Sequence, residues 1–577
     1  MKILRIFFLL LNAFLITGCQ TYIARTVLPH GIRKANYQVV IQRDVVLLTQ
    51  EGIKLVAEIY HPKAEPKTPT ILVRIPLSNT LKNRLGADAI GNFWASRGYT
   101  VVIQGTRGRY KSSGDFYPLI HEHNDGLETL KWITKQPWFN GKLGMWGGSA
   151  FGHTQWAVAD QKDIVPNAFM IQIASSDFHG MFYPGGAFSL ESALFWAVRS
   201  YGKEDRTPNF DALERGFNGF PLIEADNRAA QDVDFFNDWV LHDKPDNYWL
   251  NIDGKARAQN LQVPVLLMAG WYDPFLPTQL QDFELIKQYT DSKVANSSQL
   301  IIGPWSHADS IKFPGGSSAG DYRPASLEPS IDWFDRHLMD KHNETAKTPV
   351  KLFVMGENKW RNEYEWPLAR TQYQSYYLHN SGNANTLNGN GRLNTTLPAE
   401  HEVSDHFQYD PQHPVPSRGG AMLGPRAGIA LQNEIEMRPD VLVYTTDKFD
   451  KEIEITGLVK LVLHVSTDVP NTDFTAKLVD VHPDGRAYNI SNGILRNTFT
   501  NQKQPVAIEI KLWPTSILIK TGHKIRLEIS SSDFPRFDRN PNTGQLIATE
   551  TKTRIANQII YHNQKMPSRL ILPIIPR

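Results

Sequence analysis

Residues 142–158 read KLGMWGGSAFGHTQWAV, and this stretch decides the fold prediction. A short apolar strand at 142–146 leads into a glycine-rich turn, and an apolar helix follows around 154–158. Such a turn needs small residues because the chain reverses sharply and holds Ser149 in strained backbone geometry. The helix behind it supplies a positive dipole and a free backbone N–H for a developing oxyanion. The arrangement is typical of a nucleophile elbow, although Phe151 stands where the second glycine usually lies.

Strands and helices alternate on both sides of this turn. We predict strands at 70–74, 99–103, 142–146, 263–269, 299–302 and 350–355, the last of the sheet, with helices at 91–97, 124–136, 154–158 and 331–338. Such alternation indicates a mostly parallel sheet with helices on both faces. Between 181 and 251 the strand pattern stops, and aromatic segments with helical spacing, such as 193–201 and 235–241, predict an inserted cap.

A serine nucleophile needs a general base and an acid that orients the base. In α/β-hydrolases these follow the serine in the order Asp or Glu, then His, each from a loop at the carboxyl end of a sheet strand. Here Asp273 follows the strand 263–269, and His307 follows the strand 299–302. The sequence therefore predicts the triad Ser149, Asp273 and His307. A second glycine–serine copy at 315–320 has no apolar strand before it and is interpreted as a flexible loop.

From about residue 371 the sequence becomes all-β in character. Alternating or β-branched runs at 459–466, 506–513 and 524–529 are typical of a β-sandwich or jelly roll, and 381–394 is predicted as a loop. The predicted fold class is therefore α/β: an α/β-hydrolase core with an inserted helical cap, plus a C-terminal all-β jelly-roll domain. The predicted boundaries are 1–18 for a lipoprotein signal peptide, 41–180 and 255–370 for the two parts of the core, 181–254 for the cap and 371–577 for the jelly roll.

From about residue 41 to its end, the chain resembles the cocaine-esterase-like and X-prolyl dipeptidyl-peptidase-like serine hydrolases of the CocE/NonD type. The segments that carry the resemblance are 144–149 with Gln155, 269–273 (AGWYD), 303–307 (GPWSH), 354–356 with Trp360, 366–368, and 531–540 (SSDFPRFDRN). The resemblance implies the same three-part fold, with a C-terminal domain like that of X-Pro dipeptidyl-peptidases. It implies Ser149 as nucleophile, His307 as general base and then acid, Asp273 as its orienter, and the backbone N–H of Ala150 as one oxyanion donor.

Two departures from the family pattern bear on activity and specificity. Esterases of the family have an Arg-x-Pro-Tyr motif whose tyrosine hydroxyl is the second oxyanion donor, whereas residues 74–77 here read RIPL. Ser78 or Asn79 could substitute for that donor. The family's amino-acid ester hydrolases follow the triad aspartate with acidic residues that bind the substrate ammonium. Here Pro274 and Phe275 follow, which argues against that specificity.

The chain has one cysteine, Cys19. It follows a basic segment with Lys2 and Arg5 and an apolar run at 6–17, which is too short to span a bilayer. Residues 16–19 (ITGC) resemble a bacterial lipobox, in which the cysteine carries the lipid anchor. We therefore expect an exported protein that is lipidated at Cys19, and Gln20 favours the outer membrane, on its periplasmic or surface face. A single cysteine also excludes an intramolecular disulfide framework.

Charge and motif spacing exclude other classes of function. Lys and Arg total 61 against 59 Asp and Glu, a net charge of +2, which excludes an electrostatic nucleic-acid binder. Histidine–glutamate clusters at 121–123 and 401–406 lack the i, i+4 histidine spacing of a zinc helix and are interpreted as structural or surface residues. No metal and no cofactor is predicted.

The sequence thus predicts a serine hydrolase that cleaves small ester or amide substrates through an acyl-enzyme. Two alternatives stay open. One is an X-Pro dipeptidyl-peptidase that acts on short peptides. The other is a non-catalytic surface lipoprotein that binds glycan or protein, which the missing tyrosine at Leu77 supports. The cap aromatics are predicted as core residues that could together line an acyl or aromatic pocket over Ser149: Phe182, Tyr183, Phe188, Phe195 and Trp196. The oligomeric state is not predicted.

Overall fold

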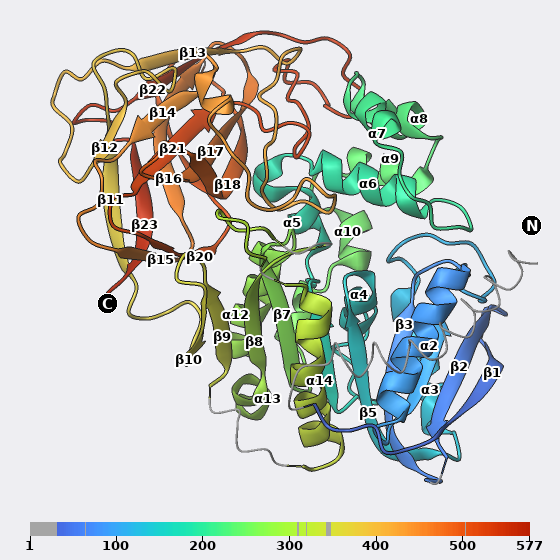
Figure 1. The fold of residues 1–577 in the computed structure, drawn as a ribbon. Helices are drawn as coiled ribbons and strands as arrows, with labels where there is room; N and C mark the ends of the chain where they lie inside the picture. The colour runs from blue at the N-terminus through green and yellow to red at the C-terminus, as the bar shows by residue number, and fades with distance from the viewer. Residues whose placement is uncertain are drawn as a thin grey trace, which may run out of the picture.

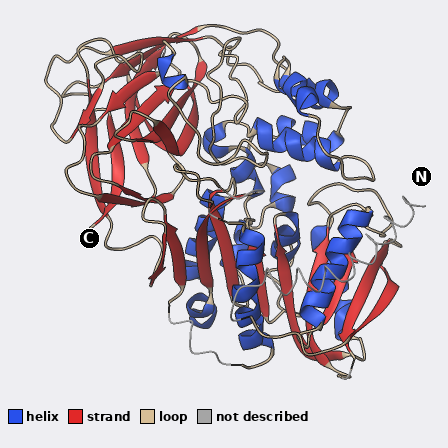
Figure 2. Cartoon of the chain, in the orientation of Figure 1, coloured by secondary structure: helices blue, strands red, loops and turns tan. Residues whose placement is uncertain are grey.

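A computed structural model describes residues 32–577 apart from 64, 165, 308–310, 319, 342–347 and 502. A sheet flanked by helices occupies the lower half of the molecule in Figure 1, with a group of helices above it on the right and a β-rich part on the upper left. Figure 2 shows the same division: helices and strands alternate in the lower part of the molecule, whereas in the upper part the strands lie on the left and the helices on the right.

The first sheet has ten strands in the order β1-β2-β4-β3-β5-β6-β7-β8-β9-β10. Their bounds are β1 (Val39–Leu48), β2 (Lys54–Pro62), β3 (Thr68–Ile75), β4 (Thr100–Gly105), β5 (Phe139–Gly148), β6 (Ala168–Gln172), β7 (Val265–Tyr272), β8 (Gln299–Ser306), β9 (Val350–Val354) and β10 (Lys359–Glu363). The pairs from β4 to β9 are parallel. The predicted mostly parallel sheet is confirmed.

Both ends of this sheet differ from the prediction. The antiparallel strands β1 and β2 were not predicted, and β10, which pairs antiparallel with β9, replaces 350–355 as the last strand. The edge strands β1 and β10 carry polar residues on their exposed side, which interrupt or replace the apolar run of a buried strand. The strand β2 is buried inside the sheet, but Glu58 and His61 interrupt its apolar pattern. The sequence of β10, KWRNE, is mostly exposed and shows this directly.

The parallel strands are buried on both faces because helices cover the sheet on each side. The helices are α2 (Leu81–Ala95), α3 (Glu122–Thr134), α4 (Ala150–Trp156), α12 (Leu276–Tyr289), α13 (Ser292–Ser297) and α14 (Tyr322–Leu338). Alternate strand residues form two apolar clusters. One contains Met145 and Leu267 with Leu130 of α3, and the other contains Met170 and Met268 with Phe334 of α14.

The cap is entirely helical and lies between β6 and β7 in the chain. Its elements are α5 (Phe178–Phe182), η1 (Pro184–Gly186), α6 (Leu190–Ser200), α7 (Phe210–Phe217), η2 (Leu222–Glu224), α8 (Ala225–Ala229), α9 (Asp234–Leu241), α10 (Asn247–Ile252) and α11 (Lys255–Gln259). Its aromatic side chains form one cluster in which Phe182, Trp196 and Trp239 stack on one another.

The C-terminal strands form a second sheet of thirteen strands around one large apolar core, with three small apolar clusters beside it. They are β11 (Gln372–His379), β12 (Arg392–Asn394), β13 (Asp405–Tyr409), β14 (Leu442–Thr445), β15 (Ile453–Gly457), β16 (Lys460–Thr467), β17 (Asn471–Val481), β18 (Ala487–Thr498), β19 (Val506–Lys511), β20 (Thr515–Ile519), β21 (Lys524–Ser530), β22 (Ala556–Tyr561) and β23 (Arg569–Ile575), with the short helix η3 (Ile435–Met437). β12 lies inside the predicted loop 381–394, which is therefore partly wrong: three residues carry too little pattern to mark a strand.

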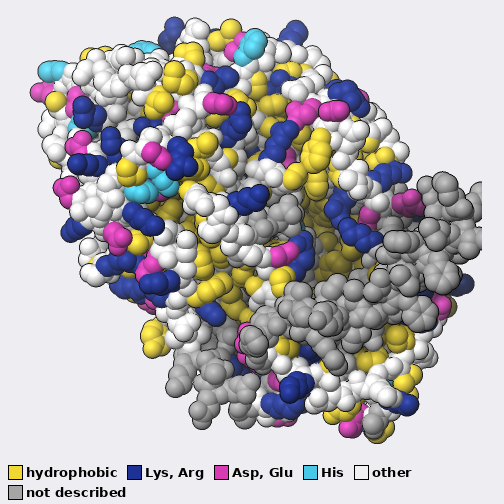
Figure 3. All heavy atoms as spheres, viewed as in Figure 1, with side chains coloured by type: hydrophobic (Ala, Val, Ile, Leu, Met, Phe, Trp, Pro, Cys, Tyr) yellow, Lys and Arg dark blue, Asp and Glu magenta, His cyan; other side chains and the backbone are white. Residues whose placement is uncertain are grey.

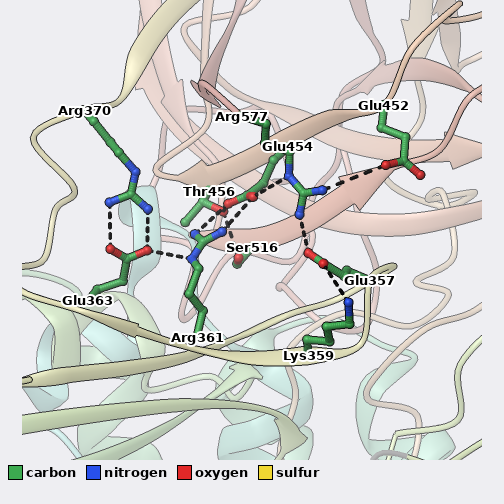
Figure 4. A network of polar contacts seen from close by, with 10 residues as sticks. All are labelled: Glu357, Lys359, Arg361, Glu363, Arg370, Glu452, Glu454, Thr456, Ser516 and Arg577. Atoms are coloured by element: carbon green, nitrogen blue, oxygen red, sulfur yellow. Dashed lines mark hydrogen bonds and ion pairs between the residues drawn. The ribbon is translucent and has the colours of Figure 1, made fainter.

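The two sheets are joined where β9 ends. The backbone of Met355 accepts a hydrogen bond from Leu518 and donates one to Ser516, at 2.8 and 2.9 Å. Beside this junction, the two terminal nitrogens of Arg361 on β10 each donate a hydrogen bond to the carboxylate of Glu454 on β15, both at 2.7 Å (Figure 4). Burial alone would raise the pKa of Glu454, but hydrogen bonds from Arg361 and Thr456 hold that pKa below its ordinary value. A charged network around the buried Glu454 thus connects the core to the β-rich domain.

Candidate active site

Ser149 occupies a strained turn between β5 and α4. Its backbone angles are φ 57° and ψ −129°, a conformation that side chains other than glycine rarely adopt. A Cβ atom on Gly147 would lie 2.5 Å from the Cβ of Phe151, and one on Gly152 would lie 2.6 Å from the Cβ of Ala174. The turn therefore requires glycine at 147 and 152, and Phe151 fits between them because its side chain packs back over Gly147.

The structure brings the three predicted triad residues together at the carboxyl edge of the sheet. Asp273 follows β7 and His307 follows β8, which pair in parallel. The Nε2 atom of His307 lies 2.9 Å from the Oγ of Ser149, and its Nδ1 atom lies 2.7 Å from the Oδ2 of Asp273. Asp273 is fully buried, and its other carboxylate oxygen accepts a hydrogen bond from the backbone N–H of Phe275 at 2.8 Å. A carboxylate held this way fixes Nδ1 as the protonated nitrogen and leaves Nε2 free to accept the serine proton.

Leu77 lies at the same edge of the sheet, two residues after β3, which pairs in parallel with β5. Its side chain packs against an apolar cluster and has no hydrogen-bonding group. The neighbouring Ser78 is buried, and its hydroxyl accepts a hydrogen bond from the backbone N–H of Asp205 at 2.8 Å. Ser78 therefore ties the end of β3 to the cap, while Asn79 is exposed.

A chain of rings connects the nucleophile helix to the base. His153 of α4 meets Phe178 edge-on at 4.7 Å, Phe178 meets Phe275 at 5.5 Å, and Phe275 lies 5.6 Å from His307. Burial lowers the pKa of His153 to about 3, so this ring is a neutral packing element. Trp196 lies 6.4 Å from Phe178 and is partly exposed. These rings thus give the site apolar surroundings. Figure 3 shows hydrophobic side chains in a hollow between the cap and the core.

Sequence reasoning missed the contribution of the β-rich domain to the site. The indole N–H of Trp513 donates to the backbone carbonyl of Asp273 at 3.3 Å, across 240 residues of chain. The guanidinium of Arg536 lies 4.4 Å from the Trp513 ring centre and is buried. Arg536 belongs to the motif 531–540, so the sequence did mark this residue as a family feature. The motif alone does not indicate which residues Arg536 contacts.

The same motif clamps the cap. The backbone N–H of Phe188 donates to the Asp538 carboxylate at 2.8 Å, and the Asp538 N–H donates to the Phe188 carbonyl, also at 2.8 Å. The backbone N–H of Glu191 donates to the Pro535 carbonyl at 3.0 Å. Cap, core and β-rich domain therefore all meet around Ser149.

The other residues considered from sequence lie away from this site or serve packing. The Oε2 of Glu122 lies 2.8 Å from the buried Arg74, and His123 contacts the Ala157 carbonyl. The carboxylate of Glu402 contacts His379 at 2.8 Å, whereas His401 is exposed. Ser317 is exposed, in the loop that precedes α14. Cys19 and the predicted signal peptide lie outside the described residues.

Asp282 of α12 is a buried carboxyl group that supports the loop after β6. Its oxygens accept hydrogen bonds from the backbone N–H of Ser176 at 2.9 Å and from the Ser176 hydroxyl. Burial raises the pKa of Asp282 to about 7. The folded chain therefore keeps this proton between pH 4 and 7 while the unfolded chain loses it, so folding stability falls as the pH rises through that window.

We accordingly expect Asp282→Asn to stabilise the protein progressively more as the pH rises. An amide stays neutral, its oxygen can accept from the Ser176 N–H, and its NH₂ can donate to the Ser176 hydroxyl oxygen. Its advantage in free energy of unfolding should therefore grow by roughly 2–3 kcal/mol from pH 5 to pH 8. Urea unfolding of both chains at the two pH values measures it. Asp211→Asn, at an exposed position, is the control and should show no such growth. An equal advantage at both pH values would contradict the prediction.

Comparison with known proteins gives two family matches along the chain. Residues 51–309 match the X-Pro dipeptidyl-peptidase (S15 family), and residues 342–571 match the X-Pro dipeptidyl-peptidase C-terminal non-catalytic domain. A cocaine esterase from Rhodococcus sp. (strain MB1 Bresler) is 35% identical over 585 residues, covering 94% of this chain and 99% of that protein.

Solved structures match over nearly the whole chain. An aminopeptidase from a marine sediment archaeon, Thaumarchaeota archaeon, superposes with a TM-score of 0.78 at 20% identity, covering 95% of this chain and 99% of its own. An α-amino acid ester hydrolase superposes with a TM-score of 0.77 at 20% identity, covering 95% and 98%. At that identity the likeness establishes the fold alone.

Proposed function

From the premise that the chain belongs to the serine hydrolase family of cocaine esterase and the S15 X-Pro dipeptidyl-peptidases, we propose that it hydrolyses carboxylic esters with Ser149 as nucleophile. Membership makes the protein a serine hydrolase of esterase or dipeptidyl-peptidase type, and so removes the non-catalytic alternative. The observation that carries the proposal is the hydrogen-bonded series Ser149–His307–Asp273.

The proposed mechanism follows from the positions of these groups. His307 Nε2 accepts the proton of Ser149 as Oγ attacks the carbonyl carbon, and Asp273 stabilises the imidazolium that forms. The backbone N–H of Ala150, at the start of α4, donates to the developing oxyanion. His307 then returns its proton to the leaving alcohol, and water hydrolyses the acyl-enzyme by the same steps in reverse.

Apolar surroundings favour an ester with an apolar or aromatic acyl group. Phe275, two residues after Asp273, packs on His307, and Phe178 packs on Phe275. An X-Pro dipeptidyl-peptidase must bind the free ammonium of a peptide, which calls for a carboxylate near the nucleophile. The residues that follow Asp273 are instead Pro274 and Phe275, so we place peptidase activity second.

Covalent labelling tests the nucleophile directly. A fluorophosphonate probe should label the purified protein and Ser317→Ala, which alters the other glycine–serine copy, but not Ser149→Ala. Labelling that persists in Ser149→Ala would falsify the assignment. With labelling established, p-nitrophenyl butyrate and benzoate tested beside Gly-Pro-p-nitroanilide separate esterase from peptidase. Faster turnover of the anilide would overturn the substrate proposal while leaving the nucleophile in place.

The absent tyrosine at position 77 predicts a gain of function. Leu77→Tyr should place a hydroxyl at the sheet edge that bears Ser149, and a second oxyanion donor is worth about 10²–10³ in kcat. We therefore expect ester hydrolysis by Leu77→Tyr to be faster, with the increase in kcat rather than in KM. Leu77→Phe supplies the ring without the hydroxyl and should give no increase. Equal rates for the two variants would show that another group already fills this role.

We also propose that the protein is exported and anchored to the outer membrane by lipid on Cys19. The support is the lipobox-like sequence 16–19 and the short apolar run before it. Within the described part of the chain, no helix is both long and apolar enough to cross a bilayer.

Replacing Cys19 should release the protein from the membrane. We expect Cys19→Ser to leave the membrane fraction for the soluble one, because the thiol is the attachment point of the acyl chains. Cell fractionation with an antibody measures the shift, and Ser149→Ala, which keeps Cys19, should stay with the membrane. Mass spectrometry of the mature N-terminus provides the second measurement, and an unmodified Cys19 there would contradict the anchor.

A further inference from the structure

Three metal-ligating side chains come together in the β-rich domain, outside the proposed active site. Asp480 lies near the end of β17, and His482 is the residue directly after that strand. His523 directly precedes β21, whose residue Lys524 pairs with Val481 of β17. The antiparallel register therefore sets His523 beside His482, and their ring centres lie 4.4 Å apart.

The donor atoms of these residues converge. The Nδ1 of His523 lies 2.8 Å from one carboxylate oxygen of Asp480, and the Nε2 of His482 lies 3.4 Å from the other. One ligand atom from each residue lies within 4.8 Å of the other two. Two ligands bound to zinc at about 2.0–2.1 Å in tetrahedral geometry lie roughly 3.3 Å apart. The two separations between histidine and carboxylate atoms, 2.8 and 3.4 Å, are close to that value.

The backbone holds both histidines in place. The N–H of His482 donates to the Arg486 carbonyl and its carbonyl accepts from Gly485, both at 2.9 Å, which closes the β17–β18 turn. The carbonyl of His523 accepts from Phe449 at 2.9 Å, and its N–H donates to Lys520 at 3.1 Å. The side chains are only partly accessible, at 12% for Asp480, 19% for His482 and 11% for His523. His482 is the most accessible of the three side chains, so we expect a cation to enter from its side.

We propose that Asp480, His482 and His523 bind a divalent transition cation such as Zn²⁺, with water as a fourth ligand. Two imidazoles and one carboxylate suit zinc and its neighbours better than Ca²⁺ or Mg²⁺, which prefer oxygen ligands. When the Nδ1 of neutral His523 binds the cation, the proton that it shared with Asp480 passes to solvent and Nε2 takes up one in its place, so the imidazole stays neutral. The carboxylate balances part of the cation charge.

The cation would link the end of β17 to the start of β21. The same hairpin reaches the active-site strand, since the Tyr272 hydroxyl, beside Asp273, donates to the Asn489 carbonyl of β18 at 3.3 Å. We assign the metal site a structural role, because its ligands lie in the β-rich domain that packs against the active site and none of them contacts the triad.

Metal titration of the purified full chain tests the proposal. After chelator treatment and dialysis, Zn²⁺ should bind with a stoichiometry of one by calorimetry and raise the thermal midpoint. Co²⁺ should give the visible absorption of a tetrahedral site. In His482→Gln and His523→Gln we expect the dissociation constant for Zn²⁺ to rise at least 100-fold and the Co²⁺ spectrum to be lost.

A matched variant separates this site from incidental histidine binding. His413 forms a similar pair with Asp410, at 2.8 Å, but is exposed and belongs to no such triplet among the described residues, so His413→Gln should bind Zn²⁺ as the unaltered chain does. Ester hydrolysis and circular dichroism check that each variant is folded. Zinc binding of equal strength in His482→Gln and the unaltered chain, or no binding by the unaltered chain, would overturn the proposal.

Discussion

Replacing Asp273 by asparagine is expected to lower kcat/KM for a p-nitrophenyl ester about 10⁴-fold. The Asp273 carboxylate accepts a hydrogen bond from the Nδ1 of His307 at 2.7 Å. In asparagine an NH₂ group, which donates hydrogen bonds, replaces one of the two carboxylate oxygens. With its NH₂ toward His307, the amide selects the tautomer in which Nε2 carries the proton, so His307 can no longer accept from Ser149. The fully buried position admits no water to replace the lost acceptor.

Two measurements distinguish this effect from a loss of structure. KM should change little, and the rate of fluorophosphonate labelling at Ser149 should fall in parallel with kcat because both need the same base. Asp282→Asn, the same chemical change nine residues along the chain on α12, should retain activity. If Asp273→Asn kept more than a tenth of the activity, Asp273 would not be the residue that orients His307.

Removing Arg361 is expected to cause the largest loss of stability. Arg361→Ala would leave Glu454 buried without its two shortest charged hydrogen bonds, and breaking a buried ion pair costs about 3–5 kcal/mol. Arg577 also contacts Glu454, at 3.2 Å, which favours the lower end of that range. Because the network joins β10 to the β-rich domain (Figure 4), the loss should appear as a lower urea midpoint of tryptophan fluorescence.

Two companion variants test the cause of that loss. Arg392→Ala breaks an exposed ion pair with Asp447 and should change the free energy of unfolding by less than about 1 kcal/mol. The double variant Arg361→Ala with Glu454→Gln should recover part of the loss, because no unpaired buried charge remains. A double variant as unstable as the sum of its single changes would show that packing, rather than charge, supports this junction.

The parallel core was predictable because its strands are buried on both faces and appear as short apolar runs between helices. The edge strands β1 and β10 were missed because polar side chains interrupt or replace the apolar run that marks a buried strand. The strand β2 lies inside the sheet and is buried, and it was missed because Glu58 and His61 interrupt its apolar pattern. The triad could be proposed for a related reason. Parallel strands end at the same edge of a sheet, and the three residues follow three predicted strands in the α/β-hydrolase order Ser, Asp, His. The sheet order, which the structure shows, brings the loops after β5, β7 and β8 together.

Sequence alone thus determined the parallel part of the sheet, the cap, the β-rich domain and the triad Ser149, Asp273 and His307. Only the tertiary structure decided what surrounds them. Trp513 reaches Asp273 across 240 residues, and His523 reaches Asp480 across 43, because antiparallel pairing and domain packing bring distant segments into contact. Local patterns record which face of an element is buried. They do not record which other element packs against that face. The packing of distant elements is what brings the apolar rings beside the triad and what brings the three ligands of the proposed metal site together.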